Sequence, residues 1–230
     1  MKKIFILTAL MTLSFFVSNG QDKTVYRGFP VMEAIDLGLS VKFANMNLGA
    51  DFPEDFGDCY AWGEIESNKT IEDYSWKAYK WCNNSKKRLT KYNTISSCGI
   101  IDNKTKLDAE DDVAHVKLGG NWRMPTKSEL EELISTKYNT NYKWEFRRLN
   151  GIPGLMITYL KNNNCIFLPA AGMIDGYNYY WRTYSCRYWS SSLVADSSSD
   201  AWSLETFKAK RVKLTAAWRS WGLYIRPVSE

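Results

Sequence analysis

Aromatic and cationic residues are concentrated in the segment from Gly176 to Trp221. Indole, phenol and guanidinium groups bury large areas at little cost in side-chain freedom and keep a hydrogen-bonding group, so they dominate binding hot spots. Flat aromatic faces also match the apolar side of a sugar ring. The segment therefore predicts a contact surface for a glycan or a protein. The residues expected to form it are Trp181, Arg182, Tyr184, Arg187, Trp202, Arg211, Trp218 and Arg219.

The aromatic content of the whole chain supports this interpretation. The 230 residues include 10 Trp and 14 Tyr, more than a core of this size needs. The alternative is that alternate aromatic residues fill the core while the cations keep the chain in solution. Trp122, Phe167 and Trp189 are expected to be core residues in either case.

Catalytic groups are hard to assemble from this sequence. The single histidine, His115, lies inside an expected helix and is interpreted as a structural residue rather than a base. The acidic residues from 108 to 112 lack the alternating Asp/Asn and Gly pattern of a calcium loop, which favours helix capping over metal binding. Glu64, Glu66 and the serines at 190–192 have no evident catalytic partners. We expect a non-catalytic protein without cofactor or metal.

The first twenty residues predict a secretory signal peptide. Lys2 and Lys3 precede an apolar run from Ile4 to Val17, and small residues lead to a cut before Gln21. The run is shorter than the about 20 apolar residues that cross a bilayer, and no cysteine near the cut would accept a lipid. We expect export to the periplasm, the cell surface or the medium, with no membrane span after cleavage.

The net charge of the chain bears on whether it binds nucleic acid. The net charge of +5 includes Lys2 and Lys3, so the exported chain would carry +3, a charge too small to favour nucleic acid as a partner.

The five cysteines, an odd number, show no metal-binding spacing. Cys82 and Cys98 flank a polar stretch that a disulfide would close, stabilising the fold by about 3 kcal/mol. Free buried thiols are the alternative. The cysteines are Cys59, Cys82, Cys98, Cys165 and Cys186.

Local patterns predict two helices among many short strands. Acidic residues at 111–112 begin the first helix, which ends at Gly119-Gly120. Thr126 and Glu129 form a capping box that begins the second helix. Short strands with glycine turns are expected from Glu33 to Glu64 and again after Lys143, with a long loop region between Asn68 and Thr105. This order indicates an α+β fold. We expect a short lead over 21–32 and a single domain over 33–230.

Six sequence blocks occur in order along this domain: EAIDLGLSVKFANMNLGA, PEDFGDCYAWGE, LDAEDDVAHVKLGGNWRMPT, FLPAAG, YWSSS and IRPVSE. They resemble the motifs of the Fibrobacter succinogenes major paralogous domain, a family common in secreted proteins of Bacteroidetes. The centre of the match is also similar to the formylglycine-generating enzyme superfamily, through residues 111–114, 119–120, 123–126 and 129–132. The segment 222–226 is similar to the closing strand of that superfamily.

The resemblance implies a C-type-lectin-like fold, with two helices packed on small, twisted, mostly antiparallel sheets and long loops on one side. In this scaffold Arg123 is expected to hold the turn from Trp122 to Thr126, because a guanidinium pairs with carboxylates and carbonyls at once. By analogy, the segment from Trp181 to Arg219 is expected to contain the specificity surface. The residues expected to serve the scaffold are Asp112, Arg123, Pro125, Thr126 and Glu129.

The chain departs from the family chemistries. The formylglycine-generating enzymes hold copper with a cysteine pair near the C-terminus, and no cysteine follows Cys186. The related sulfoxide synthases need several histidines, and the calcium motifs of classical lectins are absent. We therefore expect an exported, non-catalytic, monomeric recognition module for a glycan or a surface protein of another cell. An enzyme of the formylglycine-generating type and a structural subunit of a surface assembly are the alternatives.

Overall fold

The computed structural model describes residues 25–26, 29–30, 32–67 and 69–230. The predicted signal peptide lies outside the described residues, as does most of the lead over 21–32. Within the described ranges, no helix combines the length and the apolar character that crossing a bilayer requires.

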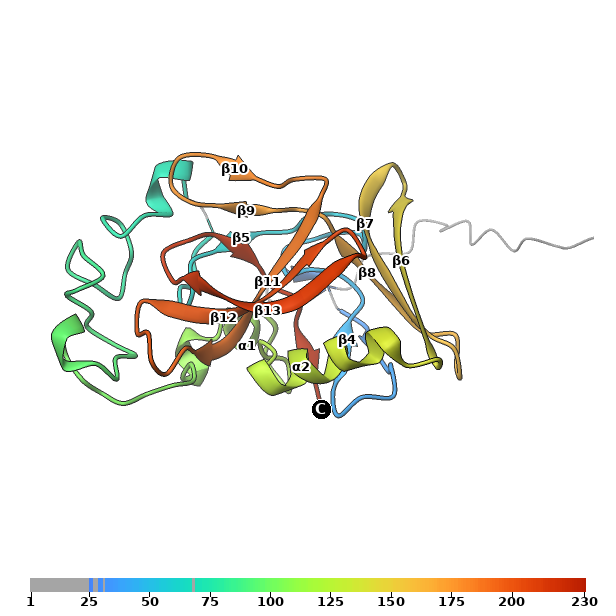
Figure 1. Cartoon of the computed structure of the whole chain (residues 1–230), viewed down its shortest axis with the longest axis horizontal. Helices are drawn as coiled ribbons and strands as arrows, with labels where there is room; N and C mark the ends of the chain where they lie inside the picture. Colours follow the sequence, from blue (N-terminus) through green and yellow to red (C-terminus); the bar gives the residue numbers. More distant parts are fainter. Residues whose placement is uncertain (1–24, 27–28, 31, 68) are drawn as a thin grey trace, which may run out of the picture.

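A five-stranded sheet forms the centre of the molecule (Figure 1). Its strands lie in the order β13 (Arg211–Trp218), β12 (Asp200–Phe207), β11 (Ser185–Leu193), β14 (Leu223–Tyr224) and β5 (Cys59–Tyr60). Neighbouring strands are antiparallel except β11 and β14, where Tyr188 is paired with Tyr224 in parallel. The sheet therefore brings an early strand, β5, beside the last part of the chain.

Smaller antiparallel sheets surround the central one. A three-stranded sheet contains β6 (Tyr142–Leu149), β7 (Ile152–Tyr159) and β8 (Cys165–Pro169). A second joins the two ends of the domain through β15 (Val228–Ser229), β4 (Lys42–Ala44) and β3 (Ala34–Ile35). Two-stranded pairs are formed by β9 (Met173–Ile174) with β10 (Tyr179–Tyr180), and by β1 (Val25–Tyr26) with β2 (Phe29–Pro30).

In the described part of the chain, two α-helices accompany these sheets: α1 (Val113–Leu118) and α2 (Lys127–Ser135). The second helix packs across β11, β12 and β13 (Figure 1). Short 3-10 turns occupy Ile71–Asp73 (η1), Ser96–Cys98 (η2), Ala109–Asp111 (η3) and Thr136–Tyr138 (η4). Two helices among many short strands confirm the coarse prediction, an α+β or mainly-β arrangement with open sheets. The first helix begins at the predicted acidic pair, since Asp112 is the N-cap of α1, and a 3-10 turn over Ala109–Asp111 precedes it.

The strand β11 is buried on both faces, which explains why much of the aromatic content is internal. Trp189 faces one hydrophobic cluster with Trp62, while Tyr188 faces a second cluster with Leu204. Each buried indole keeps a hydrogen bond, from Trp62 Nε1 to the Ser190 carbonyl (2.8 Å) and from Trp189 Nε1 to the Tyr60 carbonyl (2.9 Å). The core interpretation is therefore right for Trp189, and also for Phe167, whereas Trp122 is only half-buried.

A buried arginine ties the C-terminal segment to the first strands. Arg226 is 1% exposed and donates from Nη1 to the Ala44 carbonyl (2.9 Å), from Nη2 to the Phe167 carbonyl (2.7 Å) and from Nε to Asn47 Oδ1 (3.0 Å). Burial lowers the pKa of Arg226 from its ordinary value. Because a buried cation needs acceptors in place of water, these contacts fix three separate segments around one side chain.

All five cysteines carry free thiols. Cys82 and Cys98 are not bridged, because Leu89 lies between their segments: it forms an antiparallel bridge with Cys82, and its N–H donates to the Cys98 carbonyl (2.7 Å). The predicted stapling of the polar stretch is therefore replaced by backbone pairing. Only Cys165 is exposed.

Candidate functional site

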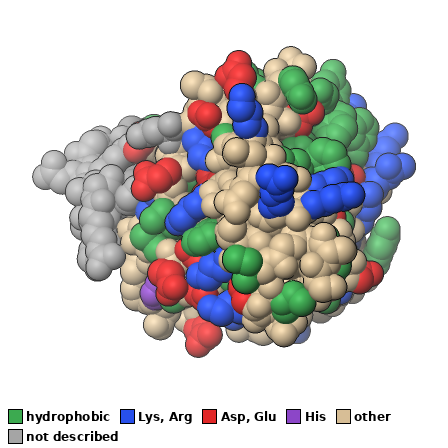
Figure 2. Space-filling view, turned by 90° about the vertical axis from the view of Figure 1, so that its left-hand side faces the viewer, with side chains coloured by type: hydrophobic (Ala, Val, Ile, Leu, Met, Phe, Trp, Pro, Cys, Tyr) green, Lys and Arg blue, Asp and Glu red, His purple; other side chains and the backbone are tan. Residues whose placement is uncertain are grey.

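Four aromatic side chains line a cleft of about 540 Å³ beside the central sheet. They come from three segments far apart in the sequence: the loop after η1, the turn between β9 and β10, and the turn after β13. Viewed from the end that carries the long loop region, hydrophobic side chains gather on one side next to Lys and Arg side chains (Figure 2). The aromatic residues of the cleft, hereafter the tryptophan cleft, are Trp76, Tyr177, Trp218 and Trp221.

The three indole rings are splayed rather than stacked. The rings of Trp76 and Trp218 are 6.5 Å apart at 57°, and those of Trp218 and Trp221 are 5.3 Å apart at 41°. Trp218 is 40% exposed and Tyr177 is 81% exposed, so their faces are accessible. The cleft therefore presents a curved aromatic surface.

Backbone pairing holds the walls of this cleft together. The N–H and carbonyl groups of Ile174 and Gly222 exchange two hydrogen bonds of 2.9 Å, which join the β9–β10 turn to the turn after β13. Gly222 is required there, because a Cβ atom would lie 2.7 Å from Cys59 Sγ and from the Tyr74 ring. Asp175 Oδ1 accepts from the N–H groups of Tyr177 and Asn178, and this local turn projects the Tyr177 ring outward.

Polar groups surround the aromatic surface. Glu72 and Lys77 are exposed, whereas Asp175 is half-buried, and hydroxyls of Ser75 and Ser220 complete the lining. A lysine also covers part of one ring, since Lys86 Nζ lies 4.9 Å from the centre of Trp218. The cleft therefore combines aromatic faces with carboxylate, hydroxyl and ammonium groups at its edges.

Arg219 lies under the cleft and not on the surface. It is 0% exposed, and its guanidinium carbon is 5.0 Å from the Trp62 ring. It donates to carbonyls of the loop region and to one phenol, namely Lys91 (3.0 Å), Tyr92 (3.0 Å), Ser198 (2.9 Å) and the Tyr79 hydroxyl (2.9 Å). The predicted place of Arg219 on the contact surface is wrong, because every donor group that these bonds use points inward.

Arg187 is also misplaced by the prediction. It is 7% exposed, forms an ion pair with Glu205, and lies 4.6 Å from the Trp181 ring. Burial lowers the pKa of Arg187, and the carboxylate of Glu205 opposes that change. Strand β11 is covered on both faces, so an arginine in its middle becomes a support for the exposed Trp181 ring instead of a contact residue.

The other predicted contact residues do not form one continuous surface. Arg182 is exposed and packs 3.6 Å from the Tyr179 ring, and Tyr184 is 50% exposed at the start of β11. Trp202 is half-buried on β12, with Lys127 Nζ at 4.6 Å. Arg211 is exposed at the opposite end of β13 from Trp218, about 23 Å away for an eight-residue strand. Of the eight, only Trp218 lines the tryptophan cleft.

The residues assigned to the scaffold do meet in the structure. Arg123 donates to both carboxylate oxygens of Glu129 (2.8 and 2.7 Å), and Thr126 and Glu129 complete the capping box of α2. Asp112 caps α1 and also accepts from Met124 N–H, while the Pro125 carbonyl accepts from Ser191 N–H (2.8 Å). Burial alone would raise the pKa of Glu129, but hydrogen bonds from Arg123 and Thr126 outweigh it and lower that pKa.

The acidic cluster at 108–111 already contains a cation. Carboxylate oxygens of Asp108, Glu110 and Asp111 lie close enough together to hold a metal ion. However, Lys91 Nζ lies among them, at 2.7 Å from Asp108, 3.5 Å from Glu110 and 2.6 Å from Asp111. Hydrogen bonds from Lys104 and Lys91 lower the pKa of Asp108 to about 2. The geometry is that of an ion-pair cluster.

Sequence reasoning missed Trp76, Tyr177 and Trp221 as a group. Trp76 belongs to a stretch with little periodicity that was interpreted only as loop, and nothing local links it to Trp218. No protein-family model, curated protein or solved structure matches this chain.

Proposed function

We propose that this protein is an exported, non-catalytic recognition module with a C-type-lectin-like fold, and that it binds a glycan in the tryptophan cleft. The observation that carries the proposal is the aromatic lining of the cleft, in which Trp218 is exposed and Trp76 and Trp221 are half-buried. Sugar rings stack their C–H faces on such rings, and their hydroxyl groups donate hydrogen bonds to acceptors at the edges. The carboxylates of Glu72, which is exposed, and Asp175, which is half-buried, are the acceptors in the lining.

The charges around the cleft favour a sugar over a cationic ligand. Aromatic cages with carboxylates also suit quaternary ammonium groups. Here, however, Lys77 lines the cleft and Lys86 already lies over the Trp218 ring. A cationic ligand would meet these two ammonium groups as well as the carboxylates of Glu72 and Asp175, whereas a neutral sugar meets no like charge. The volume of about 540 Å³ is within the range of small-ligand sites.

The buried thiols of Cys59 and Cys186 give no support to the alternative of a formylglycine-generating enzyme. Such chemistry needs accessible thiols that ionise readily. Cys186 is 0% exposed, and burial raises its pKa to about 12. Burial also raises the pKa of the Cys59 thiol.

A glycan array tests the proposal. The exported form of the chain is applied to the array, with Trp218→Ala and Trp221→Ala as test variants and Trp202→Ala as a control outside the cleft. Retention on a defined set of glycans should be lost in both test variants and kept in the control. Absence of retention by the unaltered protein, or equal loss in all three variants, would refute a glycan site at the cleft.

A further inference from the structure

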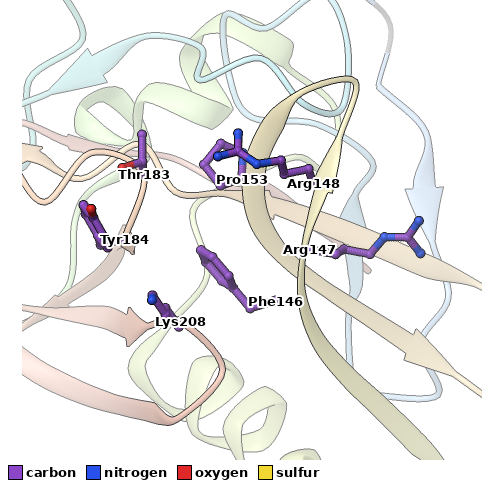
Figure 3. A pocket seen from close by; sticks show the side chains of 7 residues that line it. All are labelled: Phe146, Arg147, Arg148, Pro153, Thr183, Tyr184 and Lys208. Carbon is purple, nitrogen blue, oxygen red and sulfur yellow. The ribbon is translucent and has the colours of Figure 1, made fainter.

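A second cavity, of about 320 Å³, lies between the β6–β7 hairpin and the start of β11. Its apolar walls are Phe146, Pro153 and Tyr184 (Figure 3). The Tyr184 ring is held in place by the Phe207 ring, with centres 6.4 Å apart and planes at 14°. This cavity shares no lining residue with the tryptophan cleft and stands at the far end of β13 from it, about 23 Å away along the strand.

Two cations face this cavity. Figure 3 shows Arg148 and Lys208 around the same space as Phe146 and Tyr184, whereas Arg147 extends away from it. Arg148 is oriented by a hydrogen bond from Nη1 to the Gly151 carbonyl (2.5 Å). The guanidinium belongs to the β6–β7 hairpin and the ammonium group to the turn between β12 and β13, so two separate positive groups in the lining are available to an anionic ligand.

The positive charge at this cavity is not balanced. No carboxylate lines it, and within the described part of the chain Arg148, Lys208 and the nearby Arg211 have no ion-pair partner. The acids on neighbouring strands are already engaged: Glu205 by Arg187 and Lys213, and Glu145 by Lys143. An anion would therefore gain attraction without displacing an internal partner.

Two lining residues have positive φ, a backbone conformation that residues other than glycine rarely adopt. Thr183 has φ +71° and Lys208 has φ +52°, and for a β-branched residue such as threonine this is a true outlier. Both are fixed by backbone hydrogen bonds, from Thr183 N–H to the Ala170 carbonyl (2.7 Å) and from Lys208 N–H to the Tyr184 carbonyl (2.9 Å). Strain of this kind, of order 1–3 kcal/mol per residue, concentrates at binding sites.

We propose that this cavity binds an acidic sugar unit, with its carboxylate or sulfate group between Arg148 and Lys208 and its ring against Phe146 and Tyr184. The volume fits a small ring, and the combination of apolar walls with two cations in the lining matches a ring that carries one oxyanion. A uronic acid and a sulfated sugar share this chemistry. The site is separate from the tryptophan cleft and does not depend on the function proposed there.

Calorimetric titration tests the site with three disaccharides: one that contains a uronic acid, one that carries a sulfate ester, and one that is neutral. At low salt, at least one acidic disaccharide should bind ten-fold more tightly than the neutral one, and higher salt should weaken it. The stronger of the two acidic ligands identifies carboxylate or sulfate as the natural group. Equal affinity for all three disaccharides, or no binding, overturns the proposal.

Variants then assign the binding to this cavity. Lys208→Asn removes the charge with a residue that tolerates positive φ, and it should weaken the acidic disaccharide at least ten-fold, whereas Lys208→Arg should retain most of the affinity. Lys161→Asn removes one exposed charge beyond the other end of β7 and should change nothing. Equal weakening by Lys208→Asn and Lys161→Asn would show only diffuse attraction and would contradict the site.

Two further variants complete the test. Tyr184→Ala removes one wall and should weaken binding of the acidic disaccharide while the fold persists, because the ring is 50% exposed. Trp218→Ala should leave this binding unchanged even where it abolishes retention of a neutral glycan. Loss of acidic-disaccharide binding in Trp218→Ala would mean that the tryptophan cleft, and not this cavity, binds the anion.

Discussion

Trp218 and Arg219 are adjacent in the sequence and have opposite environments: the indole is 40% exposed in the tryptophan cleft, and the guanidinium is 0% exposed beneath it. Because Arg219 binds three loop carbonyls and the Tyr79 hydroxyl, it fixes the position from which Trp218 and Trp221 project. Arg219 therefore supports the turn from inside, while Trp218 on the same turn stays available to a ligand.

Arg219→Ala should be severely destabilising. Three buried carbonyls lose their donor, and each unsatisfied buried group costs about 1–3 kcal/mol, so we expect a loss of at least about 3 kcal/mol in the free energy of unfolding. Urea denaturation measures this loss. The exposed Arg211→Ala is the matched control and should stay within about 0.5 kcal/mol of the unaltered protein. Similar effects for the two variants would show that the buried contacts contribute little.

Glu129→Gln should remove a pH-dependent part of the stability. The pKa of Glu129 is lowered in the folded protein, so its contribution is present above the unfolded pKa of the carboxyl and is lost as the pH falls through the folded value. Thermal unfolding of both proteins between pH 3 and pH 7 gives the result. The Tm of Glu129→Gln should be lower at neutral pH and should converge with that of the unaltered protein at acid pH. A constant difference across the range contradicts the ion pair with Arg123.

Two strongly exposed tyrosines among the residues that the structure describes provide a matched pair for the cleft. Tyr177 lines the tryptophan cleft and is 81% exposed, whereas Tyr138 lies on η4 outside it and is 86% exposed. Tyr177→Ala should weaken a glycan retained by the array about five- to ten-fold, since an aromatic contact contributes about 1 kcal/mol. Tyr138→Ala should have no effect, and both should unfold normally because neither ring is buried. Calorimetry gives the affinities, and equal weakening would place the ligand elsewhere.

Thiol reactivity should separate the cysteines. Cys165 is exposed and should react first with a thiol reagent under native conditions. Cys186 is fully buried with a raised pKa and should react only after unfolding. Mass spectrometry after brief labelling identifies the modified residue. Rapid labelling of Cys186, or persistence of the fast phase in Cys165→Ser, would contradict the burial pattern.

Local signals predicted the helices and their scaffold well. The capping box of Thr126 with Glu129, and the cap at Asp112, depend on residues within a few positions of one another, so the sequence alone reveals them. Pairing of Arg123 with a carboxylate was expected from the donors of its guanidinium, and the structure shows that Glu129 is the carboxylate partner. Short strands were expected after Lys143, whereas the structure has strands of eight or nine residues there, such as β7 and β11.

The cleft was not predictable in the same way. Trp76 meets Trp218 only because β5 joins the central sheet beside β14 and because Ile174 pairs with Gly222. Arg187 and Arg219 were predicted to lie on the surface because arginine is usually exposed. Both are buried, and their hydrogen-bond or ion-pair partners and aromatic neighbours make that burial possible. Contacts between segments far apart in the sequence cannot be read from the local pattern of residues.

The most direct test of the account is an NMR titration of the ten indole N–H groups with a glycan retained by the array. The account predicts that the signals of Trp218, Trp221 and Trp76 shift together at saturable ligand concentrations, while those of the buried Trp62 and Trp189 stay in place. Shifts confined to Trp181 or Trp202, with the three cleft signals unchanged, would contradict it.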